Sequence, residues 1–99
     1  MTKTRPWDAA EYLDSEDAIA AYFSAALLDG DPTLISAALG DIARARGMAQ
    51  IARDTGLSRE SLYRALSPGG NPTLDTVVRV SKALGLTLSA SVSHETPRP

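Results

Sequence analysis

The sequence contains no cysteine and only one histidine, His94. Without thiols the chain forms no disulfide and no thiolate zinc site, and a reducing cytoplasm is the expected compartment. His94 falls among the last residues, with no cysteine to join it in a catalytic or metal-binding pair. We therefore expect no metal, no cofactor and no enzymatic activity.

Long apolar runs are also absent, since no stretch approaches the ~20 residues that span a bilayer. The first residues, MTKTRPWDAAEYL, have no apolar core of the signal-peptide type, so nothing indicates export or a membrane. The pair Gly69–Gly70 lacks the following lysine and hydroxyl of a phosphate-binding loop. Residues 1–99 are predicted to form a single domain, because this length buries a modest core but is too short for two.

The net charge of −2 argues against nucleic acid on average, but the charges are unevenly divided. Residues 1–42 hold eight acidic and two basic side chains, whereas residues 43–82 hold seven basic and three acidic ones. A basic half joined to an acidic half is typical of a DNA-binding unit connected to a part with another partner. For the acidic half, solvated faces of mixed charge are the simpler alternative.

Residues 14–47 have the pattern of an acidic helical hairpin. Asp14 or Ser15 can cap a first helix, which Gly30 ends. Pro32 then starts a second helix, because proline at the first helical position loses no hydrogen bond. Apolar residues recur along one face of each helix: Ala18, Ile19, Tyr22, Phe23, Ala26 and Leu27 in the first, and Leu34, Ile35, Ala38, Leu39, Ile42 and Ala43 in the second.

Two features of this half have alternative interpretations. Gly40 marks either a close helix crossing or a tolerated surface glycine. Residues 1–13 are predicted to form an extended N-terminal arm. Trp7 within this arm either anchors it on the core or contacts a partner.

Residues 48–67, MAQIARDTGLSRESLYRALS, predict two short helices joined by a tight turn at Gly56. Ala52 supplies the small side chain that closely crossing helices need, and Ser58 can cap the second helix. The apolar positions are Ile51, Leu57, Leu62, Ala65 and Leu66. This pattern is typical of a helix-turn-helix that offers its second helix to a DNA major groove. The alternative is an ordinary antiparallel pair with a solvated arginine-rich face.

The DNA interpretation assigns the outward-facing positions of this helix pair to nucleic acid. Those positions are Gln50, Arg53, Arg59, Glu60, Ser61, Tyr63 and Arg64. Arg59 or Arg64 can fork onto a guanine, worth ~1–3 kcal/mol of discrimination. Gln50 can hydrogen-bond a backbone phosphate, and Arg53 adds sequence-independent attraction, as do Arg44 and Arg46. The sequence leaves open which arginine contacts bases and which contacts phosphate.

Residues 73–93 change from a helical period to a strand period. The predicted helix starts at Thr73 and ends at Gly85, and its buried face holds Leu74, Val77, Val78, Ser81 and Leu84. Alternation with polar residues then predicts a half-buried strand at Leu86, Leu88, Ala90 and Val92. A lone strand needs a partner, which is the same strand of a second copy in a homodimer or else the arm at residues 5–13. Residues 94–99 are predicted to be a flexible tail.

The chain resembles the small Cro/C1-type helix-turn-helix antidote proteins of addiction modules in the run MAQIARDTGLSRESLYRALSPGGNPTLDTVVRVSKALGLTLSASV. These are HigA-like type II antitoxins encoded beside a short RelE-fold toxin. The resemblance extends upstream and covers about residues 7–92, and its most specific parts are EYLDSEDAIAAY and TGLSRESLYRALSPGGNPTLDT. It implies a mainly α fold, namely a five-helix lambda-repressor-like helix-turn-helix domain with one C-terminal β-strand.

The resemblance implies two activities. The protein would bind and neutralise its cognate toxin, a RelE- or HigB-like mRNA endonuclease, and as a dimer it would repress its own operon by binding double-stranded operator DNA. The positions that match the DNA-facing residues of the motif are Gln50, Ser58, Arg59, Glu60, Ser61, Tyr63 and Arg64. We also hypothesise that the acidic half contacts the basic, RNA-cleaving toxin.

Two alternatives compete with this interpretation. One is a stand-alone phage-type transcriptional repressor without a toxin partner, which the identity of the neighbouring gene distinguishes. The other is a protein-interaction module whose helix pair never contacts DNA. A salt-dependent shift assay separates this last alternative, since DNA binding weakens steeply with salt.

Overall fold

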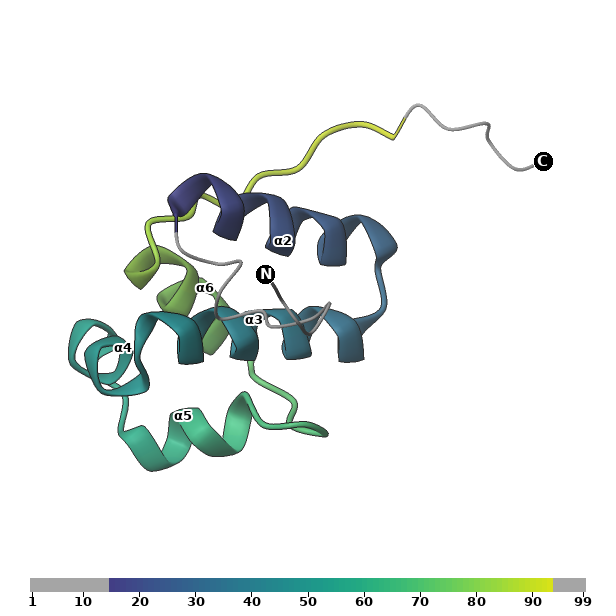
Figure 1. The fold of residues 1–99 in the computed structure, drawn as a ribbon. Helices are drawn as coiled ribbons and strands as arrows, with labels where there is room; N and C mark the ends of the chain where they lie inside the picture. Colours follow the sequence, from purple (N-terminus) through teal and green to yellow (C-terminus); the bar gives the residue numbers. More distant parts are fainter. Residues whose placement is uncertain (1–14, 94–99) are drawn as a thin grey trace, which may run out of the picture.

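Five α-helices make up the part of the chain that the computed structural model describes, residues 15–93 (Figure 1). They are α2 (Glu16–Asp29), α3 (Pro32–Arg46), α4 (Met48–Thr55), α5 (Arg59–Ala65) and α6 (Leu74–Ala83). The mainly helical architecture predicted from the sequence is confirmed. The predicted arm at residues 1–13, including Trp7, and the predicted tail at residues 94–99 lie outside the described residues.

Short-range hydrogen bonds set the helix ends close to where the sequence predicted them. The Ser15 hydroxyl accepts a backbone N–H from the first turn of α2 at 3.1 Å, and Gly30 ends that helix in the left-handed conformation, with φ of 84°. Asp31 caps α3 through its carboxylate, and Thr73 caps α6 through its hydroxyl. Each cap satisfies a backbone donor that the helix itself leaves unpaired.

The core lies around α3, which passes between α2 and α5 (Figure 1). The largest fully buried apolar side chains come from α3 to α6 and the residues that follow α5 and α6: Leu39, Ile42, Ile51, Leu62, Leu66, Val80 and Leu84. Burial of one such side chain stabilises a fold by about 1.5–3 kcal/mol. Because α3 contacts both α2 and α4, it joins the acidic hairpin to the rest of the domain.

Gly40 marks a close approach between α3 and the backbone that follows α5. A Cβ atom at this position would stand 2.5 Å from the carbonyl oxygen of Leu66 and 3.1 Å from a guanidinium nitrogen of Arg44. Only a residue without a side chain allows this spacing. Of the two interpretations of Gly40, the close crossing is therefore confirmed.

The buried face of α6 differs from the predicted one. Ser81 and Leu84 are buried as predicted, and so is Val80, which the prediction omitted. Leu74 and Val78, by contrast, are exposed. Successive helical residues are rotated by about 100°, so the face that α6 turns to the core centres on Val80 and Ser81 and leaves Val78 at its edge. Leu74 is the first residue of the helix, where little covers it.

The predicted C-terminal strand is not confirmed, since residues 86–93 form neither helix nor strand and no strand is present anywhere in residues 15–93. A strand that pairs with a second copy needs that copy for its backbone hydrogen bonds, so the pairing stays a prediction. The other predicted partner, residues 5–13, lies outside the described part of the chain. The segment runs past α2 (Figure 1), where Leu27 and Leu88 line one shallow groove.

Candidate functional site

The α4–α5 pair is shaped by two local caps. Gly56 ends α4 in the left-handed conformation, with φ of 78°, and its N–H donates to the Ala52 carbonyl at 3.0 Å. Ser58 then starts α5, since its hydroxyl accepts the backbone N–H of Ser61 at 3.0 Å. The chain therefore turns within residues 56–58, and α5 begins at Arg59 as the sequence predicted.

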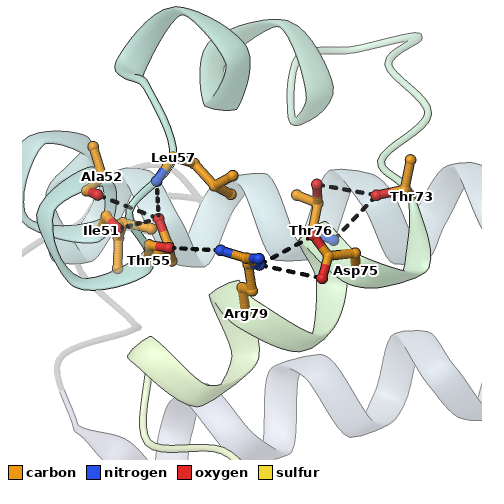
Figure 2. A network of polar contacts seen from close by, with 8 residues as sticks. All are labelled: Ile51, Ala52, Thr55, Leu57, Thr73, Asp75, Thr76 and Arg79. Carbon is orange, nitrogen blue, oxygen red and sulfur yellow. Dashed lines mark hydrogen bonds and ion pairs between the residues drawn. The ribbon is translucent and has the colours of Figure 1, made fainter.

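Thr55 is a buried residue that fixes this turn, and sequence reasoning missed it. Figure 2 shows its hydroxyl donating to the Ile51 carbonyl at 2.7 Å and accepting the N–H of Leu57 at 3.2 Å. The hydroxyl thus bridges the last turn of α4 and the residue after Gly56. A threonine at a helix end has this bonding capacity, but whether it is used depends on burial.

Arg79 connects α6 to the same turn. Its Nη1 donates to the Thr55 carbonyl at 3.2 Å, while its Nε pairs with Asp75 one turn earlier at 3.0 Å (Figure 2). The Thr55 carbonyl belongs to the last turn of α4, where carbonyls lack helical partners and favour a cation. Arg79 therefore supports the geometry of the helix pair in the free chain.

Arg44 of α3 makes the equivalent contact at the end of α5. Its Nη1 donates to the Leu66 carbonyl at 3.4 Å, and its Nη2 forms an ion pair with Asp41 at 3.1 Å. The Tyr22 hydroxyl donates to the other oxygen of Asp41 at 2.8 Å, so one polar chain connects α2, α3 and the end of α5. Burial, the hydrogen bond to Asp41 and its charge together raise the pKa of Tyr22 to about 12.

All predicted DNA-facing residues are exposed: Gln50, Arg53, Ser58, Arg59, Glu60, Ser61, Tyr63 and Arg64. The opposite side of α5 is held by Leu62, which is completely buried, and Leu66 follows it into the core. The inward and outward sides of the second helix are therefore separated as the sequence predicted. Whether nucleic acid binds this outward side stays a prediction.

Arg59 and Arg64 present different environments on α5. The Arg59 guanidinium lies 5.9 Å from the centre of the Tyr63 ring, within the range of a cation–π contact, which partly orients it. Arg64 makes no side-chain hydrogen bond or ion pair with a described residue. Both remain exposed, so each retains donors for an external acceptor.

Gln50 and Arg53 are engaged with each other and with a carboxylate on α4. The Gln50 amide nitrogen donates to Asp54 at 2.9 Å, and Arg53 donates to the Gln50 amide oxygen at 2.7 Å. This arrangement balances one cation with one anion. The Gln50 amide nitrogen carries two N–H donors, so Gln50 keeps one of them for a phosphate while it bonds Asp54, an arrangement that the sequence alone did not indicate.

The predicted dimerisation residues fall into two groups. Leu86 packs partly buried against the core, whereas Leu88, Ala90 and Val92 are exposed. Leu74 and Val78, which the sequence prediction had buried, add two further exposed apolar side chains. Of these, Leu88 and Val92 in the C-terminal segment are the candidates for contact with another protein surface.

Residues 15–93 contain neither a metal-binding cluster nor a helix that could span a membrane. No three acidic or histidine side chains there come close enough together to hold a metal ion. None of the helices in that range has the length and hydropathy required to cross a membrane.

Comparisons with known proteins bear on both halves of the chain. A family model described as a probable addiction module antidote protein matches residues 3–92, which includes the α2–α3 hairpin and the α4–α5 pair. A Haemophilus influenzae protein described as uncharacterized is 53% identical over 90 residues, covering 91% of this chain and 93% of the relative. No solved structure matches the chain significantly.

Proposed function

Because the chain belongs to the family of probable addiction module antidote proteins, we propose that it is the antitoxin of a type II toxin–antitoxin module. It binds and neutralises a RelE-like mRNA-endonuclease toxin of the HigB kind, and it represses its own operon by sequence-specific binding to double-stranded DNA. It acts as a cytoplasmic homodimer, without enzymatic activity or a cofactor.

The DNA-binding half of the proposal is carried by the exposed side of α5. Ser58 fixes the start of this helix, and Leu62 holds its inner side in the core. Arg59 and Arg64 remain on the solvent side, where their guanidinium groups can bond base edges or phosphates. We therefore propose that α4 and α5 form a helix-turn-helix and that α5 enters the major groove.

A shift assay on the DNA upstream of this chain's own gene tests this half. Affinity should fall steeply as salt rises from ~50 to ~200 mM, because phosphate contacts release counterions. An unrelated fragment of equal length, measured at the same salt concentrations, is the control. Equal affinity for both fragments would refute an operator-specific repressor, and no binding to either would refute DNA binding altogether.

A homodimer is proposed because recognition helices of this kind read two half-sites about one DNA turn, ~34 Å, apart. Leu88 and Val92 in the C-terminal segment supply exposed apolar side chains that a second copy would cover. The change Leu88→Lys should therefore give monomers that bind the operator weakly. An unchanged mass in light scattering would argue against this dimer.

Growth rescue tests neutralisation. The open reading frame next to this chain's gene is expressed alone and then together with this chain. Arrest by the neighbour alone, relieved by co-expression, supports the antitoxin. Absence of such a toxin, combined with specific operator binding, would instead favour a stand-alone repressor.

A further inference from the structure

Three leucines are exposed at the turn between α2 and α3. Leu28 is 87% exposed, Leu34 is 45% exposed and Leu27 is 43% exposed. All three lie in the last turn of α2 or the first turn of α3. Leu28 on its own leaves most of its apolar surface in water, which is the state that contact with a partner protein relieves.

The same turn carries only negative charge. Asp29 ends α2 and Asp31 caps α3, and neither carboxylate forms an ion pair with a described residue. Residues 15–43 contain no lysine or arginine at all. We call the five residues Leu27, Leu28, Asp29, Asp31 and Leu34 the hairpin tip. It combines exposed apolar side chains with two carboxylates that form no ion pair with a described residue.

The charge of the hairpin tip decides what kind of partner it fits. A second copy docked face to face through the same tip would bring its carboxylates together, and like charges at an interface are costly. A partner with a basic surface gains instead from opposite charge at the rim of the contact. A protein that cleaves RNA needs such a basic surface to hold the phosphate backbone of its substrate.

We propose that the hairpin tip is the surface on which the toxin docks. This inference rests on the proposed antitoxin function, and it adds the location and chemistry of the contact. Leu28 enters an apolar depression on the toxin, while Asp29 and Asp31 face basic side chains around it. Those basic side chains belong to the surface that binds RNA, so docking competes with the toxin's substrate.

The position of the tip separates it from the outward side of α5. The tip lies at the end of α3 opposite α4 (Figure 1). A helix of the length of α3 spans about 22 Å at 1.5 Å per residue, so the tip lies about that far from the end of α3 that meets α4. Toxin binding and operator binding should therefore be separable by mutation.

The test measures binding of the purified chain to the protein encoded by the adjacent open reading frame, by titration calorimetry. Leu28→Gln removes the apolar anchor and should weaken this binding by about tenfold or more. Leu74→Gln is the matched control, because Leu74 is 76% exposed on α6 and should leave the affinity unchanged. Both positions are exposed, so neither change should alter the melting temperature.

A second variant tests the charge of the tip. Asp29→Asn with Asp31→Asn removes both negative charges, and asparagine keeps the capping capacity at position 31. The affinity should fall about threefold to tenfold at low salt, and its dependence on salt should become shallower. Operator binding in the shift assay should not change for either variant.

The outcomes separate this inference from the proposed function. If the unmodified chain binds its neighbour, but Leu28→Gln and the double asparagine variant bind equally well, the tip is not the docking surface and the antitoxin function stands. If Leu74→Gln weakens the affinity as much as Leu28→Gln does, the hairpin tip is likewise not the docking surface. If the unmodified chain does not bind its neighbour at all, the antitoxin function itself fails, and the inference fails with it.

Discussion

The α2–α3 hairpin and the α4–α5 pair share one core but leave opposite surfaces exposed. From Ser15 to Ala43 the hairpin has acidic side chains and no basic ones, and its tip exposes leucines. The α4–α5 pair exposes Arg53, Arg59 and Arg64 and buries its large aliphatic side chains Ile51 and Leu62 completely. An apolar surface favours a protein partner, whereas a cationic polar surface favours phosphate.

The two regions also differ in how they are held. The hairpin is held by the capping residues of α2 and α3 and by the packing of these two helices in the core. The α4–α5 pair receives support from outside itself, because Arg79 of α6 bonds its first helix and Arg44 of α3 bonds the residue that caps its second. Two further arginines, which bond carbonyls within the fold, therefore support the cationic surface of the α4–α5 pair.

The largest effect is expected on operator binding, when the exposed arginines of the α4–α5 pair are replaced and the α2–α3 hairpin is left unchanged. Replacing Arg59 and Arg64 together by alanine should weaken operator binding about 100-fold, because the contacts proposed for both exposed cations with bases or phosphates are lost. Toxin binding and the melting temperature should not change. Lys82→Ala removes the same kind of charge from α6 and is the control. Because the double variant removes two charges and Lys82→Ala removes one, an equal loss per charge would mean that only overall charge matters.

The contact between the two regions can be broken at Gly40. Gly40→Ala places a methyl group against the Leu66 carbonyl and Arg44, so we expect a loss of about 1–3 kcal/mol in the free energy of unfolding. Urea titration followed by circular dichroism measures it. Ser24→Ala, on the exposed side of α2, is the control and should be neutral or slightly stabilising. A more stable Gly40→Ala variant would contradict the close crossing.

The support that α6 gives to the helix pair should have a smaller effect. Arg79→Met keeps the aliphatic stem but removes the bond to the Thr55 carbonyl, so the free energy of unfolding should fall by about 1 kcal/mol. Operator binding should weaken as well, since the turn before α5 loses a restraint. Asp75→Asn tests the exposed ion pair alone and should cost less than about 0.5 kcal/mol. The reverse order of the two effects would argue that the Thr55 contact is unimportant.

The smallest effect concerns the polar chain from α2 to the end of α5. The pKa of Tyr22 is raised to about 12 in the folded chain from an ordinary value of 10.0, so folding favours the protonated phenol. Its contribution is fully present below pH 10 and is lost as the pH rises through about 12. The unfolding free energy of the unmodified chain should therefore fall more steeply over this interval than that of Tyr22→Phe. Solvent reaches the Tyr22–Asp41 pair, so the two proteins should differ by less than about 1 kcal/mol in this pH-dependent part of the unfolding free energy. Parallel curves for the two proteins would contradict the raised pKa.

The sequence predicted the helices well because their ends are set by neighbours in the chain. Ser15, Asp31, Ser58 and Thr73 each accept a backbone N–H two or three residues later, so the cap and its partner fall in one short window of sequence. The division of charge is also a property of the sequence alone. Both features can be found without knowledge of the fold.

The predictions that failed or were left open depend on residues that are distant in sequence. Val78 was expected in the core because the period of α6 alone does not fix how the helix is rotated. Arg44 was predicted to attract DNA and Arg79 was counted only as part of the basic half, but they bond carbonyls 22 and 24 residues away. The strand at residues 86–93 needs a partner that a single chain does not contain.

The sequence by itself determined where the helices begin and end, which half is acidic, and which side of α5 faces solvent. Only the tertiary structure decided that Gly40 is a contact point, that Arg44 and Arg79 support helix ends, and that Leu28 has no cover. The physical reason is the sequence separation over which each interaction acts. Caps and helical periodicity act within about four residues, whereas packing joins segments whose separation in sequence carries no local pattern.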